Sequence, residues 1–381
     1  MKIRTLPVFL AFLAMGFGDV VGPVVSLAKD EFHLSNAVAS LIPFVGFSMF
    51  GLLSVPMGVF QDRRGKKTVL LIGLVVALVG LLNASFGLGT FLGFLLSVLL
   101  LDAGAAVLQV AGNPIMRDVS APGKYARNLS LGQFVKAIGS VSTAVVPWAA
   151  ARYFHARWQV MFPIYAVAMA ITVVAVSTLR VRKDTGERKA ATVGSCLALL
   201  GNGYVLAMVG AIFFYVGAEV CMSSYIPLFL KEQFNIDIAR LGLLGTGLFF
   251  TALTIGRFSG GVILNWMAPR KFFALTCALS IVGMLGLFVP SAAFAVAACF
   301  VAGLGFANVF PLIFSTAVEA LPQHTNGLSG LMITAIVGGA ILPPLMGVIA
   351  DRSSVLAAFV VPLAAIVYVT CAGLLAKPRA A

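Results

Sequence analysis

The feature that most constrains the fold is a series of long apolar runs that follow one another along the chain with short polar breaks. A helix that crosses a bilayer needs about 20 predominantly apolar residues. Hydrophobic residues make up 60% of the 381 residues and charged residues only 10%, whereas about a quarter of the residues in a soluble domain are charged. The sequence therefore predicts an all-α integral membrane protein with twelve spanning helices, at residues 6–28, 37–60, 68–88, 91–116, 128–150, 158–179, 203–229, 241–266, 272–290, 292–320, 327–350 and 355–375.

The basic residues are distributed unevenly among the loops that join these runs. If both termini lie on one side of the membrane, that side carries most of the 26 Lys and Arg residues. Because basic residues are enriched in cytoplasmic loops, we expect both termini in the cytoplasm and the chain in the plasma membrane, the inner membrane of a bacterium. The net charge of +13 is then a topology signal, and it does not indicate nucleic-acid binding.

A polar segment divides the chain near its middle. Residues 180–189 read RVRKDTGERK, the longest polar interruption in the sequence. This segment predicts an N-terminal six-helix bundle over 1–179, a cytoplasmic linker over 180–200 and a C-terminal six-helix bundle over 201–381. An internal repeat supports the division, because the end of the second run, GVFQDRRGKK, corresponds to the end of the eighth, GVILNWMAPR. Two parallel six-helix halves are typical of carriers in which one half rocks against the other.

Other classes of function find little support in the sequence. No soluble segment is long enough to form a nucleotide-binding domain, which excludes direct drive by ATP. The five cysteines lie in or beside apolar runs without CxxC spacing, so they predict neither a disulfide framework nor a metal site. We expect no cofactor and no enzymatic activity. An intramembrane carboxylate pair, Asp19 with Glu219, and a non-transporting sensor are the alternatives to a carrier.

The turn between the second and third runs carries a distinctive set of small and charged residues, here called the gate motif: Gly58, Asp62, Arg63, Gly65, Lys66 and Lys67. The set closely resembles the signature loop of the major facilitator superfamily. The resemblance implies the major facilitator fold, two pseudo-symmetric bundles of six helices each. Gly58 would let two helices approach closely, and Asp62 would accept hydrogen bonds from a neighbouring helix N-terminus and from basic side chains. The alternative is a solvated turn whose charges only set the topology.

A finer resemblance extends over much of the chain. Several segments are similar to the fucose and glucose/galactose permease branch of that superfamily, among them GFGDVVGP, LQVAGNPIMRDVS, RNLSLGQFVKAIGS, FFYVGAEVCMSSY and IVGGAILPPLMG. The chain departs from the fucose members at Gln109, where they carry a glutamate, and at Lys136, where they carry an uncharged residue. In the runs at 91–116 and 128–150 it also lacks, respectively, the arginine and the Gly-Pro motif that drug-efflux relatives usually carry.

The branch implies a secondary active transporter, and we expect proton-coupled symport of a monosaccharide resembling fucose, glucose or galactose, by alternating access. The expected partners are a small polar solute, a proton or a sodium ion, and the lipid bilayer, with one chain sufficient for function. The alternatives are transport of an organic anion or sugar acid, which Lys136 suggests, and drug-type efflux.

Two carboxylates inside predicted helices are candidates for cation coupling. A charge at bilayer depth costs at least about 2.5 kcal/mol and therefore needs a partner, water or a function. Asp19, near the middle of the first run, matches the helix 1 aspartate of the branch, and Glu219 lies at comparable depth in the second half. We expect Asp19 to be a buried carboxylate that takes up and releases the proton. The alternatives are a structural pair with Lys136 and, for Glu219, a hydrogen bond between helices.

Polar side chains at several helices predict a sugar-binding site. Gln109 and Asn113 are one turn apart on the same helix, where their amides can donate to and accept from sugar hydroxyls. The other candidates, any of which can instead be a packing residue, are Gln133, Lys136, Tyr215, Tyr225 and Asn308. The sequence leaves the roles of Asp102 and Arg257 open.

Overall fold

The computed structural model describes residues 5–39, 41–86, 89–179, 192–236 and 246–376, and their regular structure is helical. Most of the helices are longer than ten residues. They are α1 (Leu6–Gly16), α2 (Val21–Glu31), α3 (Asn36–Ala39), α4 (Leu41–Arg64), α5 (Lys66–Phe86), α6 (Phe91–Val119), α7 (Tyr125–Phe154), α8 (Met161–Ser177), α9 (Val193–Ala198), α10 (Gly203–Phe234), α12 (Thr246–Ile263), α13 (Pro269–Gly286), α14 (Ala292–Phe306), α15 (Val309–Ala320), α16 (Thr325–Thr334), α17 (Gly338–Arg352), α18 (Val355–Ala358) and α19 (Val360–Leu375).

Helices occupy every apolar run that the sequence predicts to span the membrane. Within the described ranges, 9 segments are long and apolar enough to cross a bilayer. The runs predicted at 6–28, 241–266 and 272–290 hold shorter helices, α1 with α2, α12 and α13. Residues 241–245 and the polar segment 180–189 lie outside the described residues. The chain is therefore a multi-pass membrane protein.

The described helices form two compact units. Unit 1 comprises Met1–Pro122, Val135–Leu197 and His324–Thr334, and unit 2 comprises Gly123–Phe134, Ala198–Gln323 and Ala335–Ala381. Each unit thus takes in one short segment from the other half of the sequence. In unit 1 this segment contains α16, and in unit 2 it contains the first turns of α7. The boundary predicted at 180–200 stays a prediction.

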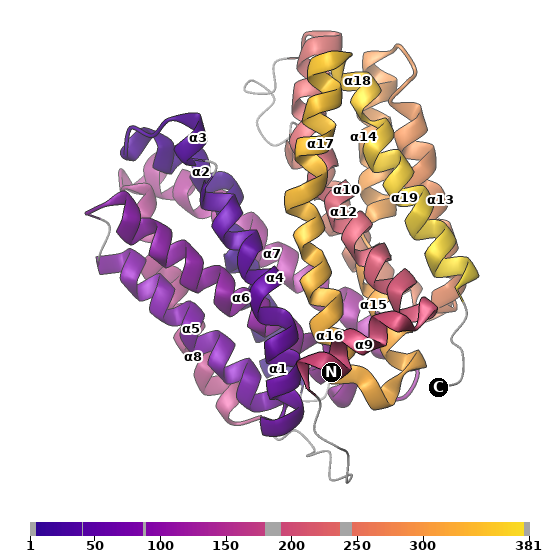
Figure 1. Cartoon of the computed structure of the whole chain (residues 1–381). Helices are drawn as coiled ribbons and strands as arrows, with labels where there is room; N and C mark the ends of the chain where they lie inside the picture. The colour runs from indigo at the N-terminus through magenta and orange to yellow at the C-terminus, as the bar shows by residue number, and fades with distance from the viewer. Residues whose placement is uncertain (1–4, 40, 87–88, 180–191, 237–245, 377–381) are drawn as a thin grey trace. The chain divides into compact units, whose positions relative to one another are not determined.

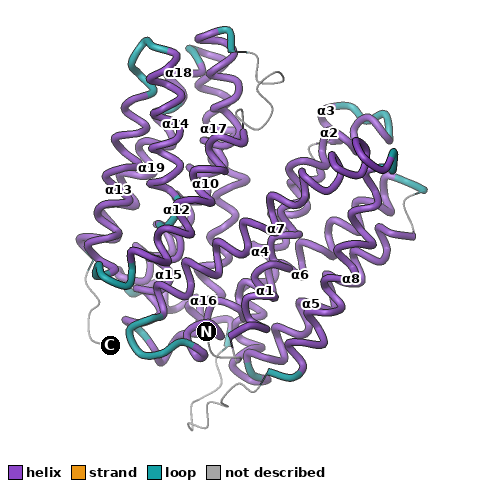
Figure 2. Tube along the Cα trace, turned by 180° about the vertical axis from the view of Figure 1, so that it is seen from behind, coloured by secondary structure: helices purple, strands orange, loops and turns teal. Residues whose placement is uncertain are grey.

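The same helix pairs recur in the two units. In unit 1, α5 packs on α6 and α8, and α4 packs on α6. In unit 2, α13 packs on α14 and α19, and α12 packs on α14. These helices correspond to each other in the internal repeat, so the repeat in the sequence reflects a repeated pattern of packing (Figures 1 and 2). Small residues allow this packing; a Cβ at Gly104 would lie 2.6 Å from the carbonyl oxygen of Gly73.

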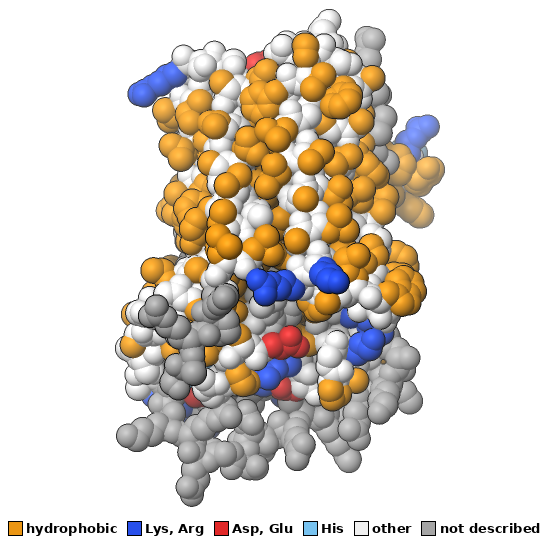
Figure 3. Space-filling view, turned by 90° about the vertical axis from the view of Figure 1, so that its right-hand side faces the viewer, with side chains coloured by type: hydrophobic (Ala, Val, Ile, Leu, Met, Phe, Trp, Pro, Cys, Tyr) orange, Lys and Arg blue, Asp and Glu red, His pale blue; other side chains and the backbone are white. Residues whose placement is uncertain are grey.

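The outer surface suits a lipid environment. Figure 3 shows hydrophobic side chains over the upper part of one face, with several Lys and Arg side chains below them. Large apolar residues such as Leu52, Val167 and Val282 are more than half exposed. Contiguous apolar surface of this kind is rare on soluble monomers, and it agrees with a protein whose helices face hydrocarbon.

Candidate functional site

Asp19 lies where the first run leaves the α-helical path. The segment η2 (Phe17–Val20) is a 3-10 turn between α1 and α2. Gly18 and Gly22 flank Asp19 in the sequence, and glycine is a poor helix former. The Asp19 side chain is 46% exposed, so the expectation of a buried carboxylate is wrong. A 3-10 turn has three residues per turn instead of 3.6, so Asp19 does not lie on the face that a continuous helix would give it.

An ion pair links Asp19 to Lys136 within unit 1. The Lys136 ammonium lies 3.3 Å from Asp19 Oδ2, and its side chain is 15% exposed. The Ser140 hydroxyl donates to the same carboxylate oxygen. The pairing expected for Lys136 as an alternative to ligand binding is present.

Two glycines let the helices of this pair approach each other. A Cβ at Gly16, on α1, would lie 2.7 Å from the backbone nitrogen of Ser140 and 2.8 Å from the Cα of Gly139, both on α7. Side chains larger than hydrogen would push the two helices apart. The glycines therefore set the short distance between η2 and α7 that the ion pair requires.

A second carboxyl group lies beside this pair. Asp102, on α6, is 4% exposed, and its Oδ2 has no hydrogen-bond partner among the described residues. Its Oδ1 lies next to Gly18: a Cβ added at Gly18 would be 3.2 Å from this oxygen. Asp19 and Lys136 are the charged groups that act on it electrostatically.

The four amides expected to bind sugar, Gln109, Asn113, Gln133 and Asn308, are all buried. Gln109 and Asn113 lie on α6 in unit 1, and Gln133 lies on the part of α7 that belongs to unit 2. Gln133 Nε2 has no hydrogen-bond partner in the described part of the chain. Gln109 and Asn113 are four residues apart on α6, so they lie on the same face of this helix, as their spacing in the sequence predicts.

Glu219 and Arg257 form an ion pair in unit 2. Arg257 Nη2, on α12, lies 3.1 Å from Glu219 Oε1, on α10, and the side chains are 11% and 18% exposed, respectively. Both charges are close to the fully buried Tyr215, whose hydroxyl donates to the carbonyl oxygen of Phe306 at 2.9 Å. Each charge expected inside the second half is thus compensated within unit 2.

Asn308 occupies a break between α14 and α15. Pro311 explains the break, because it lacks an N–H and its ring crowds the carbonyl four residues earlier. Asn308 Nδ2 donates to the carbonyl oxygen of Gly256 at 2.6 Å, while its Oδ1 has no partner within the described ranges. Tyr225 donates to the carbonyl oxygen of Pro343 at 3.4 Å. Asn308 therefore keeps an acceptor for a ligand, whereas the hydroxyl of Tyr225 is engaged with backbone.

The gate motif contacts the start of α16 inside unit 1. A Cβ at Gly58 would lie 2.8 Å from the carbonyl oxygen of Asn326 and 3.2 Å from the Cα of Gly330. Asn326 Nδ2 donates to Asp62 Oδ1 at 2.7 Å, and Gln61 Nε2 donates to Asn326 Oδ1 at 2.8 Å. The expected close approach at Gly58 is present, and Asp62 accepts from a side chain in the first turn of a helix. Sequence reasoning missed Asn326, although an amide at the start of a predicted helix was a signal for it.

The remaining motif residues shape the turn into α5. Gly65 has a φ of 86°, a left-handed conformation that glycine adopts without strain. Lys66 pairs with Asp118 at the end of α6 (2.6 Å), and Lys67 donates to the carbonyl oxygen of Ser177 at the end of α8. Arg63 is exposed. The two lysines therefore join the ends of three helices of unit 1.

The second copy of the motif makes the corresponding contact in unit 2. Gly261 packs against the side chain of Leu131, and Arg127 Nη1 donates to Asn265 Oδ1 at 3.1 Å. Leu131 and Arg127 lie in the first turns of α7. The end of α4 thus contacts the start of α16, and the end of α12 contacts the start of α7. Both members of each pair correspond in the repeat.

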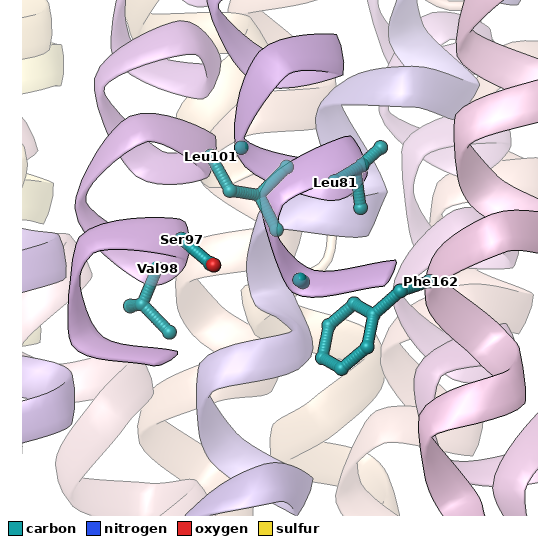
Figure 4. A pocket seen from close by; sticks show the side chains of 7 residues that line it. Leu81, Ser97, Val98, Leu101 and Phe162 are labelled. Carbon is teal, nitrogen blue, oxygen red and sulfur yellow. The ribbon is translucent and has the colours of Figure 1, made fainter. Parts of the chain in front are cut away.

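A small cavity lies between α5, α6 and α8 (Figure 4). It measures about 10 Å³, enough for one water molecule. Its lining is apolar except for Ser97. The Ser97 hydroxyl accepts a hydrogen bond from Asn83 Nδ2 and donates one to the carbonyl oxygen of Gly93. This cavity is too small for a sugar. In the described part of the chain, no group of His, Cys, Asp or Glu side chains has the arrangement of a metal site.

Nearly the whole chain is similar to known proteins. Residues 8–336 match the Major Facilitator Superfamily. The chain is 29% identical over 382 residues to the glucose/galactose transporter of Brucella abortus biovar 1 (strain 9-941), covering 96% of this chain and 92% of that protein. It is 23% identical over 416 residues to the L-fucose-proton symporter of Haemophilus influenzae, covering 95% and 94%.

The fold agrees with these matches. The crystal structure of the transporter FucP in the outward conformation superposes with a TM-score of 0.85 at 19% sequence identity, covering 99% of this chain and 98% of the other. At this identity the likeness concerns the fold alone. It supports the major facilitator fold that the gate motif implies.

Proposed function

The chain belongs to the major facilitator superfamily, and from this premise we propose that it is a secondary active transporter that carries a monosaccharide together with a proton by alternating access. The observation that carries the proposal is the extent of the similarity. Glucose/galactose transporters and L-fucose-proton symporters match almost the whole chain rather than one motif. A transporter of this class is not an enzyme, and the gradient of the coupled ion supplies the free energy for accumulation.

Asp19 is the proposed coupling residue. A charge facing hydrocarbon at bilayer depth is costly, so the exposed part of its side chain is accommodated best by water. Its carboxylate is paired with Lys136, and protonation of Asp19 would release Lys136. Loading of the proton therefore changes the charge arrangement of unit 1. Glu219, paired with Arg257, is the second candidate for coupling.

The proposed sugar ligands are the buried amides together with one lysine and two tyrosines: Gln109, Asn113, Gln133, Asn308, Lys136, Tyr215 and Tyr225. Among these, the free acceptor of Asn308 and the free donor of Gln133 carry the most weight, because each lacks a partner in the described residues. A sugar hydroxyl can satisfy either atom. Lys136 already has a carboxylate partner, which favours a neutral sugar over an organic anion.

The remaining features of the proposal concern topology and assembly. We place both termini in the cytoplasm and the chain in the inner membrane of a bacterium, on the basis of the basic loops. The bundles extend over 1–179 and 201–381, joined by a cytoplasmic linker at 180–200. One chain forms the pathway, and the coupling ion is a proton rather than sodium because the fucose relatives are proton symporters by name.

Uptake by proteoliposomes tests the proposal. The purified protein is reconstituted, and labelled glucose, galactose or fucose is added outside under an inward proton gradient. We expect concentrative uptake of at least one of these sugars, abolished by a protonophore and unaffected by an imposed sodium gradient. Uptake driven only by sodium would overturn the choice of ion. Transport of hexuronates or of organic cations, with none of the hexoses, would overturn the choice of substrate.

A further inference from the structure

Asp102 is a buried carboxylic acid that has no role in the transport cycle proposed above. Its side chain is 4% exposed, and Oδ2 is shielded from solvent without a hydrogen bond from the described residues. An ionised carboxylate in such a place loses its hydration without replacement. The free energy is lower if the group carries a proton or if a cation compensates it.

While Asp19 is ionised, it is paired with Lys136, so no nearby cation is available to compensate a charge on Asp102. Lys136 and Asp19 are the charged groups that act on it, from α7 and η2. The other helices packed on α6, namely α1, α4, α5 and α16, carry their charged side chains only within residues 62–67, around the turn between α4 and α5. Lys136 is already paired with Asp19 at 3.3 Å. A neutral Asp102 therefore gives the group of three side chains a net charge of zero.

Asp102 lies next to the segment that contains Asp19, the proposed coupling residue. Its Oδ1 lies against the backbone of Gly18, the residue before Asp19, with room for little more than a hydrogen there. Asp19 is 46% exposed, whereas Asp102 is enclosed by α6 and its neighbours. One carboxyl of the pair can thus exchange protons with water while the other is shielded from it.

We propose that Asp102 is a second proton-holding group of the unit 1 site, which alternates with Asp19 as the counterion of Lys136. In one state Asp102 is protonated and Asp19 is the carboxylate paired with Lys136. In the other state Asp19 holds the proton, and the Asp102 carboxylate compensates Lys136. One proton is shared by two carboxyl groups, Lys136 stays protonated, and the net charge is zero in both states. The link to coupling rests on the proposed function, whereas the protonation of Asp102 does not.

Infrared spectroscopy of the purified, lipid-reconstituted protein without any solute tests the protonation state. We expect a carbonyl band of a protonated carboxylic acid in the wild type, and its loss in Asp102→Asn. The matched control is Asp118→Asn, at the end of the same helix, where the carboxylate is paired with Lys66; the band should persist there. Absence of the band from the wild type, or its persistence in Asp102→Asn, would overturn the proposal.

Thermal stability gives a second readout. Asparagine has nearly the shape of a neutral aspartic acid, so Asp102→Asn should melt within a few degrees of the wild type. If an ionised Asp102 instead shared Lys136 with Asp19, the variant would remove one of the two counterions of a buried ammonium. A large drop in melting temperature, or failure to fold, would therefore contradict the proposal.

Transport separates this inference from the proposed function. Asp102→Asn should retain exchange of labelled sugar across the membrane at equal concentrations and should lose accumulation driven by a proton gradient. Accumulation equal to that of the wild type would remove Asp102 from the coupling mechanism. If the wild type shows the acid band but transports no sugar, the proposed function fails while the protonation of Asp102 stands.

Discussion

The ammonium of Lys136 lies 3.3 Å from a carboxylate oxygen of Asp19, and Ser140 donates a hydrogen bond to the same oxygen. The positive charge inside α7 is therefore compensated within unit 1. A substrate does not need to bring a negative charge to this place. The pair thus bears on both coupling and the choice between a neutral sugar and a sugar acid.

The first prediction concerns selectivity at Lys136. Because Lys136 is engaged with Asp19, we expect hexoses to stabilise the wild-type protein more than hexuronates in a thermal-shift assay, since a ligand that binds the folded state raises its apparent stability. Lys136→Gln should not reverse this ranking. A wild type that prefers hexuronates, with the preference lost in Lys136→Gln, would show that the lysine binds the substrate instead.

The second prediction concerns the pair of Glu219 and Arg257. Removing one member of a largely buried ion pair leaves the other charge uncompensated, at a cost of roughly 3–5 kcal/mol. We expect Glu219→Gln and Arg257→Gln each to destabilise strongly, and the double variant to be less destabilised than the sum of the two. A double-mutant cycle on thermal unfolding measures this coupling. Strictly additive effects would mean that the 3.1 Å contact contributes little.

The third prediction compares corresponding glycines of the repeat. The atoms nearest a Cβ at Gly58 belong to the backbone of Asn326 and Gly330, whereas those nearest a Cβ at Gly261 belong to the side chain of Leu131. Backbone cannot move aside as a leucine side chain can, so Gly58→Ala should cost roughly 1–3 kcal/mol and Gly261→Ala clearly less. Melting temperatures of the two variants check this order. A larger loss for Gly261→Ala would contradict the packing described for α4 and α16.

The apolar runs predicted the helices well because the bilayer imposes both length and polarity on each span. The breaks within spans were harder to predict. The turn at Asp19 and the break at Asn308 depend on glycines and a proline whose effect in a membrane helix varies with the neighbouring helices. For this reason Asp19 was expected to be buried, while the structure leaves its side chain 46% exposed.

Partners distant in the sequence show a second limit of sequence reasoning. The motif identified Gly58 and Asp62, but Asn326 is 264 residues from Asp62, and a pattern in one sequence does not specify that contact. Likewise, Asp102 had no identifiable role until the structure showed it beside Gly18. The pair of Lys136 and Asp19 was open to prediction because few charges inside the helices were available to compensate each other.

The fourth prediction concerns the orientation of the chain. The basic loops place residues 180–189 in the cytoplasm. In a variant without native cysteines, single cysteines introduced in this segment should resist an impermeant thiol reagent added to intact cells and react after permeabilisation. Cysteines introduced at Phe154 or Phe288, which are exposed near ends of helices predicted to lie outside, serve as labelled controls. Rapid labelling of 180–189 in intact cells would reverse the proposed topology.

Asp19→Asn tests most directly whether proton binding at Asp19 drives accumulation of the sugar. The variant mimics the protonated side chain, so it removes the titration while preserving shape. In proteoliposomes it should bind the sugar and exchange it across the membrane at equal concentrations. Under an inward proton gradient the wild type should concentrate the sugar, whereas Asp19→Asn should only equilibrate it. Accumulation by Asp19→Asn against the sugar gradient would exclude Asp19 as the coupling residue.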